Sequence, residues 1–281
     1  MPIRKSTSKP TIGSAIANIP LQSLGTKLSY IVLLIAFLVI GYLIGKVESL
    51  QKGAATVAVA PAPSQQQGQP GQPAAPKITL DAVKKAFDKA VIKFGSSSSK
   101  NVVIEAADPS CPFCHAAAGK NPELSKQMGP QFTPVSDGGT YVAPVPELKK
   151  LLDEGKISYA YIYTPGHGNG EMGIKAFYCA FENGKFWEAH DLIMSNKGYD
   201  LLNNTVKNDK TKSQDVADFL APVIDPSFMK SCLDSGKYDK TPQEETSLAS
   251  SIGASGTPTY YINDTQKVGA LSFTEFKPLI K

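Results

Sequence analysis

The sequence predicts an α/β fold for the part of the chain that follows residue 77. Three runs rich in β-branched and aromatic residues have the length and composition of buried strands, at 101–108, 157–164 and 260–262. Between them, apolar residues recur at helical spacing. Because strands and helices alternate along the chain, we expect a sheet covered by helices.

The formal charge of +4 at pH 7 has a local origin. The chain carries 29 Lys and Arg against 25 Asp and Glu. Arg4, Lys5, Lys9 and Lys27 all lie in residues 1–27, which contain no acid. Without these four, basic and acidic residues are equal in number, which argues against a nucleic-acid-binding domain.

An uncharged run, LSYIVLLIAFLVIGYLIG, extends from Leu28 to Gly45. As a helix it would rise about 27 Å, close to the hydrocarbon thickness of a bilayer. We therefore predict a single transmembrane helix, with the basic residues 1–27 in the cytoplasm and the rest of the chain outside. The alternative is a cleaved signal peptide, since Ala58-Val59-Ala60 resembles a cleavage site. That site lies well beyond the apolar run, so an uncleaved anchor is favoured.

Residues 46–77 form a predicted linker between this anchor and a folded domain at 78–281. The segment consists largely of Ala, Pro, Gln and Gly and lacks the large apolar residues of a core. As a flexible coil it would span roughly 30 Å between its ends.

The folded domain is predicted to begin with a helix over 80–94, in which Leu80, Val83, Phe87, Val91 and Phe94 are helically spaced. The strand at 101–108 leads directly into a cysteine pair and then a helix, which Asn121-Pro122 interrupts or ends. A long loop is expected over 128–146, followed by a helix at 147–154. After the strand at 157–164 come a glycine-rich connection, a mostly helical stretch over about 173–252, a short strand VGAL at 268–271 and a closing helix at 273–280.

Cys111-Pro112-Phe113-Cys114 is the sharpest local signal in the chain. Two intervening residues allow both sulfurs to meet in the first turn of a helix, where free backbone N–H groups stabilise a thiolate on the first cysteine. Cys111 is therefore the expected nucleophile, and Cys114 the expected resolving thiol.

Other uses of this spacing remain open. A structural zinc site would need about two more ligands, and the sequence has no second C-x-x-C. A static disulfide is another reading. His115 completes the C-x-x-C-H pattern of c-type haem attachment, with Met128 as a conceivable axial ligand. The strand directly before the motif favours a redox-active cysteine pair over haem.

A second motif, distant in the sequence, favours one of these uses of the cysteine pair. Gly256-Thr257-Pro258-Thr259 precedes the apolar run Tyr260-Tyr261-Ile262. With these residues the chain resembles the DsbA-like thiol:disulfide oxidoreductases of the thioredoxin superfamily, of the membrane-anchored bacterial type. The resemblance implies a thioredoxin fold with a helical insertion at about 165–255. It also implies that Pro258 is a cis-proline opposite the cysteines, and that Thr257 and Pro258 help hold the client's backbone.

The resemblance implies further roles. Glu105 corresponds to a buried acid beneath the cysteines, which would accept or return the proton of the resolving thiol. Cys179 and Cys232 correspond to a second, structural disulfide. GKFWEAHDLIM at 184–194 resembles the insertion signature of the family, so we expect its Phe186, Trp187 and Leu192 to be core residues, His190 a structural residue, and His167 a loop residue.

These features predict an extracytoplasmic protein thiol:disulfide oxidoreductase in the bacterial cell membrane, with no metal or organic cofactor. Its partners would be exported client proteins and a membrane redox partner that recycles the cysteines. Oxidase activity is preferred over reductase or isomerase activity, which would use the same residues. The alternatives from other classes are a membrane-tethered c-type cytochrome and a non-catalytic thioredoxin-fold binding module.

The chain departs from the family in two places. Phe113 replaces the histidine of the strongly oxidising prototype, so a weaker oxidant is expected. Residues 120–146 replace a shorter connection, which leaves partner choice open.

Overall fold

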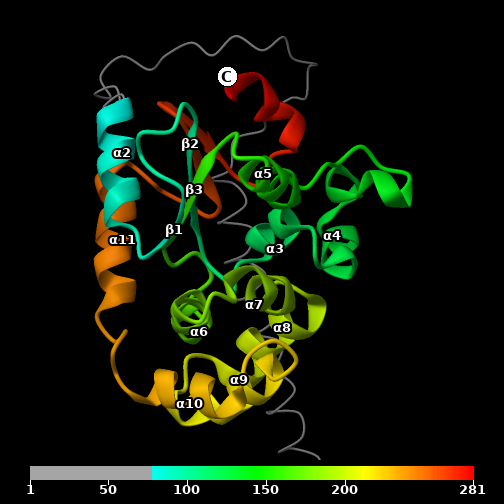
Figure 1. Ribbon diagram of the computed structural model, residues 1–281. Coiled ribbons are helices and arrows are strands. Elements are labelled where there is room, and N and C mark those ends of the chain that lie inside the picture. The colour runs from blue at the N-terminus through cyan, green and yellow to red at the C-terminus, as the bar shows by residue number, and fades with distance from the viewer. Residues whose placement is uncertain (1–77) are drawn as a thin grey trace, which may run out of the picture. The chain divides into compact units, whose positions relative to one another are not determined.

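The computed structural model describes residues 78–281, which contain a five-stranded mixed sheet in the order β1-β3-β2-β4-β5 (Figure 1). The strands β2 and β3 are parallel, and the other neighbouring pairs are antiparallel. The bounds are β1 Ile92–Phe94, β2 Val102–Ala107, β3 Ser158–Tyr163, β4 Thr259–Ile262 and β5 Thr265–Val268.

The predictions for residues 1–77 lie outside the described residues. These are the basic segment 1–27, the membrane helix Leu28–Gly45 and the linker 46–77. Within residues 78–281, none of the helices combines the length and the apolar character needed to cross a bilayer.

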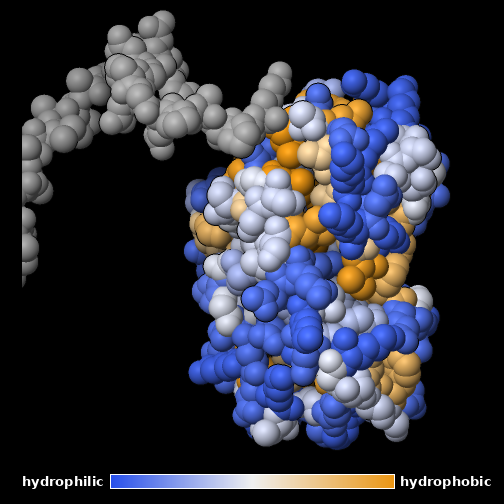
Figure 2. All heavy atoms as spheres, turned by 90° about the vertical axis from the view of Figure 1, so that its left-hand side faces the viewer, coloured by the Kyte–Doolittle hydropathy of each residue, from blue (hydrophilic) through white to orange (hydrophobic). Residues whose placement is uncertain are grey.

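Helices cover both faces of the sheet, and Figure 1 shows α2 (Leu80–Lys89) and α11 (Thr241–Ser251) side by side against one of them. Val83 and Phe87 from α2 and Ile252 beyond α11 pack on Ile104 and Tyr261 of the sheet. Figure 2 views the molecule from this side, where hydrophilic side chains cover much of the surface. Every residue of β2 and β3 is buried, as expected for central strands covered on both sides.

The opposite face carries the helix that follows Cys111 and the helices between residues 171 and 234. The remaining helices of residues 78–281 are α3 Pro112–Ala118, α4 Pro122–Met128, α5 Pro144–Asp153, α6 Glu171–Glu182, α7 Phe186–Ile193, α8 Asn196–Asp200, α9 Ser213–Leu220 and α10 Pro226–Asp234. A π-helical turn, Leu201–Val206, follows α8, and a 3₁₀ turn, Lys210–Lys212, precedes α9. The helical content of 171–251 agrees with the sequence prediction, which did not include the π-helical turn.

The predicted helix over 80–94 is wrong in its last turn, because α2 ends at Lys89 and β1 follows. Ala90 has an extended backbone (φ −60°, ψ 140°). Ile92 is fully buried and pairs with Tyr161 of β3. Val91 and Phe94 fit a helical period, but pairing with the sheet outweighs that local preference.

Pro122 begins a helix and does not end the preceding one, which stops at Ala118 with Gly119 (φ 66°) as its C-cap. Asn121 caps α4 by accepting the Leu124 N–H at 3.1 Å, and Pro122 occupies the first turn, where its missing N–H costs nothing. The following loop contains 3₁₀ turns at Pro130–Phe132 and Val135–Asp137. For the same reason α5 starts at Pro144, three residues before the predicted start at Glu147.

The C-terminal elements differ from the prediction. The last strand is Thr265–Val268, not 268–271, because Asn263 (φ 56°) turns the chain tightly so that Ile262 faces Thr265. The expected helix at 273–280 is a pair of 3₁₀ turns, Phe273–Glu275 and Lys277–Leu279. Pro278 lacks the N–H that a continuous helix would use there.

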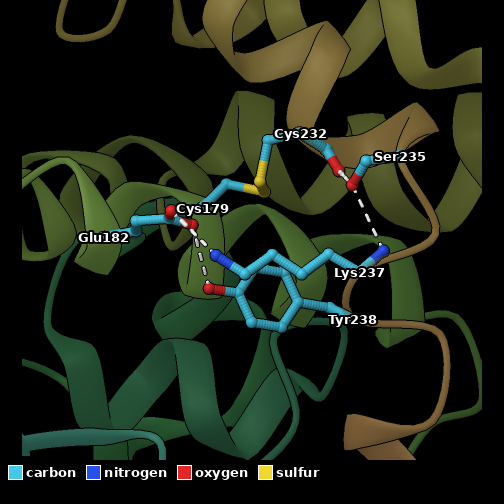
Figure 3. Close-up of a disulfide and its surroundings, with 6 residues drawn as sticks. All are labelled: Cys179, Glu182, Cys232, Ser235, Lys237 and Tyr238. Carbon is cyan, nitrogen blue, oxygen red and sulfur yellow. Dashed lines mark hydrogen bonds and ion pairs between the residues drawn. A yellow bond between two sulfur atoms is a disulfide. The ribbon is translucent and has the colours of Figure 1, made fainter.

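A disulfide joins Cys179 of α6 to Cys232 of α10 (Figure 3). Figure 3 also shows Glu182, one turn after Cys179, accepting hydrogen bonds from Lys237 Nζ at 2.8 Å and from the Tyr238 hydroxyl at 3.0 Å. α10 is therefore attached to α6 by a covalent bond, and the segment after α10 by polar contacts.

Candidate active site

Cys111 and Cys114 lie at the N-terminus of α3, directly after the central strand β2. Cys111 is the N-cap residue, and Pro112 opens the helix. Cys111 is 4% exposed and Cys114 is fully buried, and both are free thiols. The backbone N–H groups of the first helical turn therefore face the Cys111 sulfur.

The Thr257–Pro258 peptide lies opposite this helix terminus and is cis. The register of the sheet places it there, since Thr259 at the start of β4 pairs with Ala106 near the end of β2. The Thr257 carbonyl oxygen lies 3.6 Å from Cys111 Sγ. The structure thus brings together Cys111, Cys114, Thr257 and Pro258, which the sequence analysis predicted to share one site.

The local environment lowers the pKa of Cys111 from 9.0 to about 6. The largest cause is a hydrogen bond from the Cys114 side chain, and burial opposes it. A hydrogen bond with the Thr257 side chain and the backbone N–H groups of Cys114 and Phe113 add to the lowering. Cys111 is therefore mostly a thiolate at neutral pH, the form that reacts with disulfides.

Cys114 has the opposite tendency. Burial raises its pKa well above 9.0, and the hydrogen bond to Cys111 raises it further. The backbone N–H of Asp108 contacts Cys114 Sγ at 3.5 Å. The pair therefore holds one proton, which resides on the buried sulfur.

Glu105 lies within the sheet beneath the cysteines and is 1% exposed. Its carboxylate accepts hydrogen bonds from the hydroxyl groups of Tyr159 on β3 and Tyr260 on β4. Burial raises the pKa of Glu105, and both tyrosine hydrogen bonds act against that rise. Charge on Glu105 in turn raises the pKa of Cys114. The two groups are therefore electrostatically coupled.

His115 has no ring nitrogen available for haem. The ring is fully buried, with Nδ1 2.9 Å from the Met194 carbonyl oxygen and Nε2 2.8 Å from the Pro109 carbonyl oxygen. Burial lowers its pKa to about 4. His115 thus connects the cysteine helix to the end of α7, which is a structural role.

The residues Phe186, Trp187, His190 and Leu192 of the insertion signature lie in or against the core. Phe186 is 2% exposed, and Trp187 and Leu192 pack against the main core while partly buried. His190 is buried among the rings of Phe186, Trp187 and other aromatic residues. His167 is an exposed loop residue.

Phe113 forms part of an aromatic rim. Its side chain is 46% exposed, and its ring centroid lies 5.9 Å from that of Phe132, which in turn contacts Tyr141 at 5.5 Å. Residues 120–146 therefore contact the dipeptide between the cysteines.

Sequence reasoning missed Asp108, Ser110 and Asn203. Asp108 is fully buried and accepts the N–H and the O–H of Ser110. Asn203, in the π-helical turn, donates to the Ser110 carbonyl at 3.1 Å. The only sequence signal for this group is the Asp108-Pro109-Ser110 turn after the strand, because aspartate commonly binds the backbone two residues on.

Comparisons with known proteins support this architecture. A family model described as thioredoxin matches residues 144–281, just under half of the chain. The match includes the Thr257–Pro258 loop but not the cysteine pair. A search of curated proteins found no significant match.

Solved structures match a larger part of the chain. Two variants of alpha-DsbA1 from Wolbachia pipientis each have a TM-score of 0.50. They are 16% and 17% identical to this chain, over 70% and 72% of it and 94% of their own length. The chain has a thioredoxin-like fold. Oxidised BdbD from Bacillus subtilis has a TM-score of 0.48 and 17% identity, over 73% of this chain and 94% of its own. At these identities the similarity shows the fold alone, and the chemistry must be argued from the site.

Proposed function

We propose that the chain is a protein thiol:disulfide oxidoreductase that uses Cys111 and Cys114 as its redox pair. The observation that carries this proposal is the asymmetry of the pair: the pKa of Cys111 is lowered to about 6, while that of Cys114 is raised. An exchangeable dithiol needs one nucleophilic thiolate and one protonated sulfur beside it.

In the oxidising direction the pair begins as a disulfide. A client thiolate attacks Cys111 Sγ, the bond to Cys114 breaks, and Cys114 leaves as a thiolate that takes a proton from Glu105. A second client thiolate then attacks the client sulfur of the mixed disulfide and releases Cys111 as a thiolate. Two electrons pass from the client to the protein, and Glu105 regains a proton through solvent exchange. The reductase reaction is the reverse sequence.

The low pKa of Cys111 favours oxidation of clients. A stabilised thiolate makes Cys111 a good leaving group and stabilises the reduced form of the pair, so that the disulfide is a stronger oxidant. Such nucleophiles have pKa values between about 3.5 and 7.5. A value of about 6 corresponds to an oxidant of intermediate strength, as expected with Phe113 in place of a cationic side chain.

The client would bind across the Thr257–Pro258 loop. The Thr257 carbonyl oxygen lies beside Cys111 Sγ, so an extended client chain joined to that sulfur passes over this main chain. Phe113 and Phe132 provide an apolar rim next to it. Clients with apolar residues flanking the cysteine suit this surface.

The proposed location is the outer side of a bacterial cell membrane, with the anchor at Leu28–Gly45 and exported proteins as clients. Its support is the sequence alone, namely the basic segment 1–27 before the apolar run. A membrane redox partner would reoxidise the pair. Protease treatment of intact and of lysed spheroplasts tests this placement, because an extracytoplasmic domain is digested in both.

The activity is tested by mixing the oxidised protein with a reduced peptide that contains two cysteines, and following peptide oxidation. Cys111→Ser should abolish exchange. Cys114→Ser cannot form the redox disulfide, so it should not oxidise the reduced peptide; mixed instead with the peptide in its disulfide form, it should accumulate a mixed disulfide through Cys111. Full peptide oxidation by Cys111→Ser would refute the proposal.

A further inference from the structure

The Asp108 carboxylate connects two segments that are 58 residues apart in the chain. One oxygen, Oδ1, accepts the Ser110 N–H at 2.8 Å and the Ser110 hydroxyl at 2.7 Å. The other, Oδ2, accepts the N–H groups of Gly166 at 2.7 Å and His167 at 2.9 Å. The side chain thus binds the cysteine loop with one oxygen and the glycine-rich loop with the other.

The glycine-rich loop in turn rests against the Thr257–Pro258 loop. A Cβ atom placed on Gly166 would lie 1.8 Å from Thr257 Oγ1 and 2.9 Å from Thr257 Cβ. Only glycine permits so close an approach of the backbone. Gly170, at the other end of the loop, has the same relation to Asp108, whose Oδ1 would lie 1.8 Å from an added Cβ.

These contacts form a continuous mechanical path from the cysteine pair to the client-binding loop. The path runs from Ser110 through Asp108 to Gly166, and from Gly166 to Thr257, whose carbonyl oxygen faces Cys111 Sγ at 3.6 Å. The sheet fixes β2 and β4 relative to each other, but both loops lie beyond the strand ends. Their separation therefore depends on what fills the space between them.

We propose that Asp108 and Gly166 are positioning residues that set the Thr257 main chain at the distance from Cys111 that a protein client requires. The inference rests on the proposed function and extends it to residues that touch neither the client nor the reacting sulfurs. A protein client must bind along the Thr257 main chain while its sulfur meets Cys111 in line with the breaking bond, so a shift of about 1 Å is costly. A small dithiol needs only access to Cys111.

Gly166→Ala is the sharpest test, since it pushes on Thr257 and leaves both cysteines unchanged. Its matched control is Gly168→Ala in the same loop, where no atom of residues 78–281 lies within 4 Å of an added Cβ. Because Gly168 has φ +90°, this control also includes the backbone strain of a substitution in the loop. Both variants are assayed with the reduced two-cysteine peptide and with dithiothreitol, and their thermal unfolding is recorded.

We expect Gly166→Ala to lower kcat/KM for the peptide at least tenfold, with the dithiothreitol rate within threefold of wild type. Gly168→Ala should keep both rates within threefold. Asp108→Asn should show the same selective loss on the peptide as Gly166→Ala. Both oxygens of Asp108 accept hydrogen bonds, and the Asn NH₂ group would face donors at one of these two positions. Asp225→Asn, which alters a comparable cap far from the site at the start of α10, should not show this loss.

The outcomes separate the two proposals. If wild type oxidises neither substrate, the proposed function fails and this inference fails with it. If wild type is active and Gly166→Ala matches it on the peptide, or loses both substrates equally, the positioning role is refuted while the redox function stands. Equal losses in Gly166→Ala and Gly168→Ala on the peptide would also refute it, by pointing to loop strain rather than to the Thr257 contact.

Discussion

The Tyr260 hydroxyl donates a 3.0 Å hydrogen bond to Oε1 of Glu105, its direct neighbour across the β2–β4 pair. Side chains of directly paired residues lie on the same face of a sheet, so the register alone brings the two together. Tyr159 donates to the other carboxylate oxygen from β3. The acid beneath the cysteines is therefore held by hydroxyl groups from both neighbouring strands, with its charge disfavoured by burial and favoured by these two donors.

We expect Glu105→Gln to stabilise the protein increasingly as pH rises. Burial raises the Glu105 pKa above its ordinary 4.5, so its contribution to stability is intact below 4.5 and is lost as pH rises through the raised value. Gln does not ionise. Urea unfolding of the oxidised protein from pH 4 to pH 8 measures the difference, with exposed Glu244→Gln as control. A difference that shrinks with rising pH would contradict the assigned burial cost.

Glu105→Gln should also slow the chemistry. Without the carboxyl group, Cys114 must lose its proton to solvent before it attacks the mixed disulfide, so this resolving step of the reductase direction should slow roughly a hundredfold, the low end of the range for a positioned acid or base. Stopped-flow fluorescence of peptide release measures this step. Unchanged resolution across pH 5 to 9 would remove the proton relay from the mechanism.

Alkylation of reduced protein by iodoacetamide should be half-maximal near pH 6 and should modify Cys111 alone. The thiolate is the reacting form, and Cys114 is buried with a raised pKa. Cys114→Ala should move the midpoint up toward 9.0, because it removes the largest cause of the lowering. A wild-type midpoint near 9 would disprove the thiolate assignment.

Phe113→His should make the pair more oxidising. An imidazolium next to Cys111 would stabilise the thiolate, lowering its pKa by about one unit and raising the reduction potential by about 30 mV. Phe113→Leu, which removes the aromatic contact with Phe132 without adding a donor, should leave the potential nearly unchanged. If the two variants shift the potential equally, the effect comes from lost packing.

Removal of the second disulfide should cost stability but not exchange activity. The bond closes a loop across 53 positions, worth about 4 kcal/mol in the chain-entropy treatment. The double variant Cys179→Ala with Cys232→Ala should lower the unfolding free energy by about 2–4 kcal/mol. Peptide oxidation should persist, since Glu182 still binds Lys237 and Tyr238. Loss of exchange in a folded double variant would assign this disulfide a redox role.

The parts of the site that the sequence predicted are those with a local signature. Cys111 and Cys114 occur within one helical turn and follow an obvious strand. Pro258 and Glu105 could be assigned to the site only through the family resemblance, because strand pairing rather than closeness in sequence brings them near the cysteines. Asp108 was not predicted because its distant partners are backbone N–H groups, which almost any residue could provide.

The strands and helices were likewise predictable only where the sequence carries a local pattern. Long runs such as 101–108 and 157–164 carry enough pattern to be recognised as strands. The three-residue strand β1 does not, because Ile92 becomes a strand residue only through pairing with Tyr161. The π-helical turn follows α8 without any sequence feature that distinguishes it from a regular helix.

The central claim is that Cys111 and Cys114 form one reversible dithiol. Its most direct test is a redox titration in glutathione buffers, with mass spectrometry of the peptides that carry each cysteine. We expect a single two-electron transition between free thiols and a Cys111–Cys114 disulfide, while Cys179 and Cys232 stay bonded throughout. A transition at Cys179 and Cys232 instead, or separate glutathione adducts on Cys111 and Cys114 with no bond between them, would contradict the account.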